Sequence, residues 1–376
     1  MMMYKSLGNI ATYINGYPFK PEDRGKTGLP IIRIQDLTGN AYDIGFYDGE
    51  YPSRIEINDG DILISWSASL GVYVWNRGRA LLNQHIFKVV FDKAEVDKQY
   101  FVYAVQYKLK EMEAKTHGAT MKHIIKKDFD NTLIPFPDVC EQTRIADKLS
   151  CVEKVIAKRK EQLKNLDELT KARFAELFGD PYASGFKFET CKLSEIATKV
   201  TDGEHGTVPR VNKGEGPLYI MARNITQENT MDFSELSYIP QENHNKIYSR
   251  CNPEKGDLLL VCVGATVGKV ALVPDMEPFS LARSVALIKP DKRIVTSEFL
   301  LHLMDGDYIQ NQIQNSLHAA AQAGLYTKTI ASLEVFAPPM KLQEEFAVFV
   351  QAIDKSKLLE ERQVGFIAKI SQKPGR

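Results

Sequence analysis

Residues 141–178 read EQTRIADKLSCVEKVIAKRKEQLKNLDELTKARFAELF, without a glycine or a proline. Apolar residues recur along this stretch at alternating spacings of four and three, which is the period of a coiled-coil seam. The seam consists of Ile145, Leu149, Val152, Ile156, Leu163, Leu166 and Leu177, with Arg159, Thr170 and Arg173 at its other positions. Gly179 and Pro181 follow, as is typical where a helix ends. The pattern predicts one continuous helix, about 57 Å long at roughly 1.5 Å per residue.

A second stretch of the same character follows Pro339 and is free of glycine until Gly365. Its apolar seam holds Phe346, Val350, Ile353, Val364 and Ile367. Because one helix cannot bury such a seam alone, we predict that the two helices pair with each other in an antiparallel coiled coil and hold two domains apart. The alternative is that each helix packs on its own domain.

The rest of the chain is two copies of one plan, because six segments recur in the same order about 190 residues further along. The matched segments are 7–12 with 193–198, 29–37 with 217–225, 60–64 with 256–260, 69–71 with 266–268, 82–90 with 281–289, and 134–137 with 335–338. This period is too long for a solenoid repeat, so the sequence indicates a duplicated domain.

Within each copy, short runs of Val, Ile, Tyr and Phe lie between Gly, Pro, Asn and Asp, which is typical of strands and turns. The proline-containing segments 134–137 and 335–338 mark the change to helix. We therefore predict an α+β fold, with two similar β-rich domains separated by two long helices that form an antiparallel coiled coil. The predicted boundaries are 1–137 and 179–338 for the domains, and 138–178 and 339–376 for the helices.

The composition is that of an ordinary globular chain. It has 376 residues, of which 44% are hydrophobic and 26% charged, and Lys+Arg equals Asp+Glu at 48 each. These values exclude a disordered or collagen-like chain. They give no bulk positive charge for nucleic acid, although a local basic face can exist on a neutral chain.

The expected location is the cytoplasm, with no membrane span. The first 14 residues lack the apolar segment of a signal peptide, and the most apolar stretch, 258–273, is short and interrupted. The cysteines are odd in number and scattered, which argues against a disulfide framework. They are Cys140, Cys151, Cys191, Cys251 and Cys262.

Catalytic motifs are missing. Residues 263–270 resemble a phosphate loop, but one residue is lacking between the glycines and Val270 stands where Ser or Thr would hold Mg²⁺, so a turn between two strands is the better interpretation. Residues 179–182 read GDPY, which resembles the catalytic tetrapeptide Asp-Pro-Pro-Tyr of adenine methyltransferases but has only one of its two prolines. No GxGxxG, HExxH or GxSxG pattern is present. We expect no catalytic residue, no metal site and no cofactor in this chain.

Polar residues that could read DNA follow the matched strands. Arg and Lys pair with guanine, Asn and Gln pair with adenine, and Ser, Thr and Lys position phosphates. The candidates in copy one are Asn76, Arg77, Arg79, Asn83, Gln84, His85, Lys115, His117, Thr120, Lys122 and His123. The candidates in copy two are Arg223, Asn224, Lys269, Arg283, Ser284, Gln322, Tyr326 and Lys328. Each could instead be a solvated surface residue, and Trp66 and Trp75 either stack on bases or belong to the core.

Several motifs together resemble the specificity (S) subunit of type I restriction-modification enzymes. They are GDILISWSASLG (60–71), LNQHIF (82–87), GATMKH (118–123), IPFP (134–137), EQTRIA (141–146), KRKEQL (158–163) and LFGDP (177–181). Their order, together with the duplication, covers nearly the whole chain. One departure is LQEEFA at 342–347, where the family has Glu-Gln-x-x-Ile-Ala, and it leaves the packing of the second helix open.

The resemblance implies a sequence-specific DNA-binding subunit without catalysis of its own. Two target-recognition domains would each read one half of a split target on double-stranded DNA, and the paired helices would act as a ruler. The implied partners are two modification subunits, which bind S-adenosylmethionine and methylate adenine, and restriction subunits, which use ATP and Mg²⁺ to translocate and cleave DNA.

Two other classes of function remain open. A single-chain DNA methyltransferase or nuclease with fused recognition domains would need a cofactor loop or an acidic cluster. A protein-binding scaffold made of twin β-domains would not need polar and basic groups in matched loops.

Overall fold

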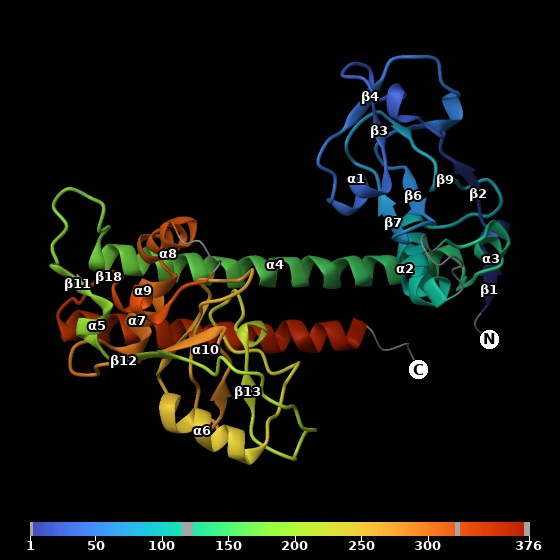
Figure 1. The fold of residues 1–376 in the computed structure, drawn as a ribbon. Coiled ribbons are helices and arrows are strands. Elements are labelled where there is room, and N and C mark those ends of the chain that lie inside the picture. The colour runs from blue at the N-terminus through green and yellow to red at the C-terminus, as the bar shows by residue number, and fades with distance from the viewer. Residues whose placement is uncertain (1–2, 115–122, 320–323, 372–376) are drawn as a thin grey trace. The chain divides into compact units, whose positions relative to one another are not determined.

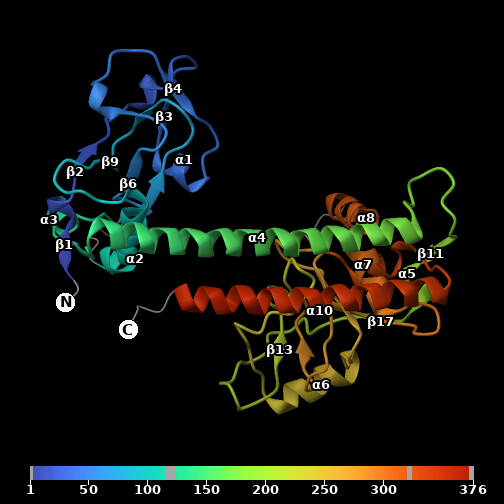
Figure 2. The same cartoon turned by 180° about the vertical axis from the view of Figure 1, so that it is seen from behind.

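The computed structural model describes residues 3–114, 123–319 and 324–371, and for 319, 361, 364 and 366–371 it describes the backbone only. The chain divides into a first unit, Met1–Ala157, and a second unit, Lys158–Ile370. Figures 1 and 2 show the elements of each unit from two sides. The helix α4 (Val139–Phe178) is continuous through the boundary and, at 40 residues, is about 60 Å long.

The first unit contains two four-stranded sheets and a two-stranded pair. One sheet is antiparallel, in the order β2 (Thr12–Asn15), β9 (Ile86–Val90), β6 (Ile62–Ser65) and β7 (Gly71–Val74). The other has the order β4 (Gly45–Tyr47), β3 (Leu29–Ile32), β8 (Ala80–Leu82) and β5 (Glu56–Ile57), with β3 and β8 parallel. The remaining elements are the pair β1 (Tyr4–Ser6) and β10 (Leu133–Pro135), and the helices α1 (Ile34–Thr38), α2 (Lys98–Ala114) and α3 (Lys126–Asp130).

The second unit repeats this plan. Its antiparallel sheet has the order β12 (Ala197–Asp202), β17 (Val285–Pro290), β14 (Leu258–Val261) and β15 (Val270–Leu272). A parallel pair, β13 (Tyr219–Ile220) with β16 (Ser280–Leu281), corresponds to β3 with β8, and β11 (Thr190–Lys192) with β18 (Glu334–Phe336) corresponds to β1 with β10. The helices are α5 (Leu193–Ile196), α6 (Gln241–Cys251), α7 (Ser297–Asp305), α8 (Asp307–Ala319), α9 (Thr327–Ala331) and α10 (Met340–Ser371).

The described residues also form single turns of 3₁₀-helix. They are η1 (Leu7–Asn9), η2 (Pro21–Asp23), η3 (Ser53–Ile55) and η4 (Ala222–Asn224). The identical strand order of the two antiparallel sheets confirms the predicted duplication, and residues 262–269 form the predicted turn between two strands. Gly179 ends α4 with a φ of 77°, as a C-terminal glycine should.

Matched glutamines join each long helix to its domain. Gln142, in the first turn of α4, accepts a hydrogen bond from Asp97 N at 3.0 Å and donates to Pro137 O at 2.8 Å. Gln343, in the first turn of α10, accepts from Thr296 N at 2.8 Å and donates to Pro338 O at 2.7 Å. Both side chains are fully buried. The motif at 342–347 departs from the family pattern, but its Gln343 makes the same contacts that Gln142 makes in the first copy.

The two long helices pack together within the second unit, which confirms the predicted antiparallel pairing. Arg159 of α4 pairs with Glu360 of α10 at 2.7 Å, and Asp167 pairs with Lys357 at 2.5 Å. Further along α4, Arg173 pairs with Glu345. Residue numbers fall along one helix as they rise along the other, so the helices are antiparallel (Figures 1 and 2).

The seam between the helices is apolar and continues into the core of the second unit. Thr170, Val350 and Ile353 are each less than 9% exposed. Phe174 of α4 lies 5.3 Å from Phe346 of α10 and 5.5 Å from Phe299 of α7, measured between ring centroids. The helices thus pack on each other, and α4 also packs on the domain of the second copy rather than only on its own domain. The side chains of Val364 and Ile367 lie outside the described residues.

Two further expectations can be compared with the structure. No helix in the described parts of the chain is long and apolar enough to cross a membrane. Trp75 is a core residue, 3% exposed, and its indole Nε1 donates to Gly78 O at 2.5 Å. Trp66 is only partly buried and is considered below.

Candidate nucleic-acid interface

In the first unit, three segments meet where strand β6 ends. Trp66 N donates to His85 O at 3.1 Å, and Ile124 N donates to Trp66 O at 3.0 Å. These bonds join the end of β6 to the turn before β9 and to the segment before α3. We call the side chains gathered here the first edge, and they are Asn15, Trp66, Gln84, His85 and His123.

The second unit repeats these bonds. Cys262 N donates to Ser284 O at 2.9 Å, and Leu325 N donates to Cys262 O at 2.7 Å. The end of β14 is thereby joined to the turn before β17 and to the segment before α9. We call the side chains gathered here the second edge, and they are Asp202, Cys262, Lys269, Arg283 and Ser284.

A glycine fixes each edge. Gly16 follows β2, and a Cβ atom on it would lie 2.0 Å from Asn83 O. Gly203 follows β12, and a Cβ atom on it would lie 2.2 Å from Leu281 O. Real Cβ atoms do not approach a carbonyl oxygen so closely, and therefore only glycine lets these chain segments meet.

The first edge is aromatic and carries polar side chains that can form hydrogen bonds. Trp66 Nε1 donates to Asn15 Oδ1 at 3.1 Å, and its ring centroid lies 4.9 Å from that of His85 and 6.4 Å from that of His123. Burial, and secondarily the neighbouring His123, lowers the pKa of His85. His85 is therefore neutral at pH 7 and can act as both donor and acceptor.

The second edge is charged. Asp202 Oδ2 lies 2.6 Å from His205 Nε2, and Arg283 is exposed. Burial raises the pKa of the Cys262 thiol to about 12, and its Sγ donates to Arg283 O at 3.3 Å. This thiol is therefore a structural group rather than a nucleophile. The two edges have the same backbone arrangement but differ in the side chains they present.

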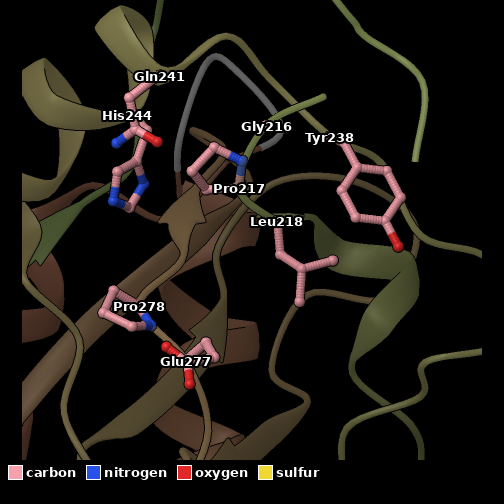
Figure 3. A pocket seen from close by; sticks show the side chains of 8 residues that line it. All are labelled: Gly216, Pro217, Leu218, Tyr238, Gln241, His244, Glu277 and Pro278. Carbon is pink, nitrogen blue, oxygen red and sulfur yellow. The ribbon is translucent and has the colours of Figure 1, made fainter. Parts of the chain in front are cut away.

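A separate hollow of about 410 Å³ lies in the second unit (Figure 3). It is lined by Gly216, Pro217, Leu218, Tyr238, Gln241, His244, Glu277 and Pro278. Gly216–Leu218 come directly before β13, and Glu277 and Pro278 come just before β16, whereas Arg283 comes just after β16. The other lining residues, Tyr238, Gln241 and His244, lie at the start of α6 or just before it. Because β13 and β16 are parallel, the hollow and the second edge lie at opposite ends of this strand pair. Within the described residues, no group of three or more His, Cys, Asp or Glu side chains could hold a metal ion.

Comparison with known proteins identifies the family. The model of the type I restriction modification DNA specificity domain matches residues 2–166 and 187–364, one match for each copy. The chain belongs to this family. It is thus a specificity subunit of a type I restriction-modification system, the non-catalytic component that directs target recognition for methylation and restriction.

Relatives of this specificity subunit span most of its length. It is 25% identical to the type I restriction enzyme EcoBI specificity subunit of Escherichia coli over 93% of this chain and 78% of the relative. It is 23% identical to the MjaVIII specificity subunit of Methanocaldococcus jannaschii over 80% of this chain and 74% of the relative.

Solved structures share its fold. The S subunit of the type I restriction-modification system from M. genitalium gives a TM-score of 0.59 at 16% identity, covering 100% of this chain and 97% of that one. A chain from a structural study of complex assembly and conformational transition of the type I R-M system gives 0.58 at 16% identity, covering 98% and 95%.

The structure of this specificity subunit brings some of the predicted DNA-binding residues together. Asn83, Gln84, His85 and His123 lie at or beside the first edge. Lys269, Arg283 and Ser284 belong to the second edge, and Tyr326 and Lys328 follow Leu325, whose amide is bonded there. Arg223 is nearby, because the amide of its neighbour Ala222 donates to Ser284 Oγ at 3.2 Å. Their contact with DNA stays a prediction.

Other predicted residues lie elsewhere. Asn76, Arg77 and Arg79 follow the far end of β7, where Arg79 pairs with Glu56 at 2.8 Å and Arg77 donates to Asp36 O at 2.9 Å. Their DNA contact also stays a prediction, at a different place on the first unit. The remaining candidates lie outside the described residues, and they are Lys115, His117, Thr120, Lys122 and Gln322.

The prediction for Asn224 is wrong. Its side chain is 1% exposed, and Nδ2 donates to Asp232 O and Glu235 O, both at 3.0 Å. Its Oδ1 accepts from Met221 N at 3.1 Å. The amide therefore holds a turn together and offers nothing to a base.

The sequence analysis missed two polar residues at the edges, Asn15 and Asp202. Each directly precedes one of the matched glycines, Gly16 and Gly203. An Asx-Gly pair at the same place in both copies was the available signal.

Proposed function

We propose that this specificity subunit reads a bipartite sequence on double-stranded DNA, one half with each unit, and directs adenine methylation and cleavage by its partners. The proposal rests on one observation. The first and second edges have the same backbone hydrogen bonds, but they present different side chains. A repeated scaffold with changed polar groups is what two readers of different sequences require.

The proposed domains are 1–137 and 179–338 for target recognition, and 138–178 and 339–376 for the two spacer helices. The proposed partners are two modification subunits, which carry S-adenosylmethionine, and restriction subunits, which carry ATP and Mg²⁺. The proposed location is the cytoplasm, where DNA and these partners are found. The neutral net charge of the chain supports a role for the partners in neutralising phosphates.

The test is reconstitution with its modification subunit, S-adenosylmethionine and DNA of random sequence, followed by sequencing of methylated adenines. We expect methylation at one bipartite motif with a fixed gap. Methylation at unrelated sites, or at a single undivided motif, would contradict the proposal.

A second measurement distinguishes a non-catalytic subunit from a single-chain methyltransferase. The purified chain alone is incubated with radiolabelled S-adenosylmethionine and DNA, and we expect no labelled DNA. Incorporation of label by the isolated chain would favour the single-chain methyltransferase instead.

A further inference from the structure

Gln84 and Arg283 occupy the same position in the two copies. Gln84 N donates to Tyr17 O at 2.9 Å, and Arg283 N donates to Glu204 O at 3.0 Å. These acceptors are themselves equivalent, because Tyr17 N and Glu204 N donate to the last residues of β8 and β16, at 2.8 and 2.9 Å. The matched segments 82–90 and 281–289 already pair residue 84 with residue 283, and these backbone hydrogen bonds show that the two residues occupy the same place in the fold.

The side chains on either side of this position are already engaged. Asn83 Oδ1 accepts from Gln84 N at 2.8 Å, and His85 packs on the ring of Trp66. In the second unit, Ala282 has no polar side chain, and Ser284 Oγ accepts from Ala222 N. Gln84 and Arg283 therefore remain as accessible polar side chains on a fixed turn, whereas His85 Nδ1 is buried without a hydrogen-bond partner among the described residues.

Gln84 and Arg283 have no hydrogen bond or ion pair from their side chains to any described residue. Gln84 is partly exposed and Arg283 is exposed. The preceding glycine contacts fix the backbone at both positions. Gln84 and Arg283 thus each place an unpaired, multivalent hydrogen-bonding group on a rigid support, which is the arrangement that base recognition needs. Lys269 of the second edge also has no side-chain partner among the described residues, but its ammonium group lacks the two-pronged geometry.

We propose that Gln84 and Arg283 are equivalent specificity-determining residues, and that Gln84 reads an adenine in one half-site while Arg283 reads a guanine in the other. The glutamine amide matches the N6 and N7 atoms of adenine, and the guanidinium matches the O6 and N7 atoms of guanine, in both cases with two hydrogen bonds. The inference rests on the proposed function, because it names the residues through which each unit would read its half-site.

The experiment exchanges the two residues. The variants Gln84→Arg and Arg283→Gln are each reconstituted with the modification subunit, and methylated sites are mapped on DNA of random sequence. We expect Gln84→Arg to change adenine to guanine at one position of one half-site, and Arg283→Gln to change guanine to adenine in the other. The preference at that position should shift by about ten- to a hundredfold, with all other positions unchanged.

Arg283→Lys distinguishes a base contact from a phosphate contact. Lysine keeps the positive charge but loses the two-pronged geometry of the guanidinium. If Arg283 reads guanine, this variant relaxes the sequence at one position. If Arg283 only binds a phosphate, Arg283→Lys keeps the motif and Arg283→Gln weakens methylation equally at all sites, which would overturn the proposal for this residue.

The controls make the same chemical changes elsewhere on each unit. Gln106→Arg adds a positive charge on the exposed side of α2. Lys255→Gln removes a positive charge just before the first residue of β14, at the end of the strand away from the second edge, where Lys255 pairs with Asp275 at 3.1 Å. Both should leave the motif unchanged. A defined motif for the native chain that is unaltered in both exchange variants would overturn this inference alone, whereas the absence of any bipartite motif for the native chain would overturn the proposed function.

Discussion

Arg159 and Glu360 form an ion pair, with 2.7 Å between Nη1 and Oε1, although they lie 201 residues apart in the sequence. The arginine occupies a seam position of α4 where an apolar residue is usual. The other oxygen of Glu360 is buried without a hydrogen-bond partner among the described residues, so the carboxylate depends on this one cation. The pair is therefore one of the contacts that set the register of the two helices, together with Asp167–Lys357 and Arg173–Glu345.

Removing one member of this pair should destabilise the protein more than removing both. We expect Arg159→Ala to cost about 1–2 kcal/mol, because it leaves a half-buried carboxylate uncompensated. The double variant Arg159→Leu with Glu360→Leu should recover most of the loss. Thermal unfolding of the native chain, the single variant and the double variant measures their order of stability. Lys164→Ala, which breaks the exposed ion pair with Glu168, is the control. A double variant less stable than the single one would contradict this account.

The matched glutamines should stabilise different units. Replacing Gln142 with Leu leaves the amide of Asp97 and the carbonyl of Pro137 unsatisfied, and we expect a loss of about 2–4 kcal/mol. The chain has 2 tryptophans, and both lie in the first unit. Gln142→Leu should therefore lower the denaturant midpoint followed by tryptophan fluorescence.

Gln343→Leu is the corresponding variant in the second unit. It should lower the midpoint followed by circular dichroism, which also reports the second unit, while the fluorescence midpoint moves little. Gln351→Leu, on the exposed face of α10, serves as the control and should change the free energy of unfolding by less than about 0.5 kcal/mol. Equal shifts in both signals from each variant would show that the units do not unfold separately.

His302 should make the protein less stable in mild acid. This residue of α7 lies 5.1 Å from the ring of Phe346, and burial lowers its pKa to about 4. Nearby Lys357 and Lys171 lower the pKa further, while Asp305 and Asp167 oppose them. Because an unfolded histidine has a pKa near 6.5, the unfolded state takes up a proton first, and stability falls as the pH drops from about 6.5 to about 4.

The measurement compares melting temperatures at pH 7 and pH 5. We expect this histidine to contribute a loss of about 2 kcal/mol over that interval. His302→Leu should remove that part of the decline, whereas His318→Leu, at an exposed position of α8, should not. An equal decline in His302→Leu and the native chain would contradict the assignment.

Lengthening the paired helices should lengthen the gap between the half-sites. Seven residues inserted between Leu163 and Leu166 add one heptad and about 10 Å, which corresponds to about three base pairs. The insertion in α4 alone separates Arg159 from Glu360 and should lower stability. A second heptad between Lys357 and Glu360 should restore the pairing.

Methylation mapping of the doubly lengthened chain provides the test. Both half-sites should be unchanged, and the gap should grow by about three base pairs. A single substitution at the surface of α4, Lys164→Ala, is the control and should change neither. Altered half-sites, or a gap of the original length, would contradict the hypothesis that the length of the paired helices sets the gap.

The sequence by itself determined the two long helices and the duplication. The four-three spacing on α4 and the glycine at 179 are local signals, and local periodicity survives whatever the rest of the chain does. The duplication was readable because the same strands recur in the same order. The antiparallel pairing also followed, since two exposed apolar seams in one chain have each other as the nearest partner.

Only the tertiary structure decided which polar residues are available for recognition. Asn224 and Arg283 looked alike as candidates, but the first is buried in a turn and the second is exposed. The sequence match of 82–90 with 281–289 pairs Gln84 with Arg283, but only the backbone hydrogen bonds to Tyr17 and Glu204, far away in the sequence, show that both residues sit at the same place in the fold. Exposure and register are set by contacts between distant segments, and no local pattern of residues encodes those contacts.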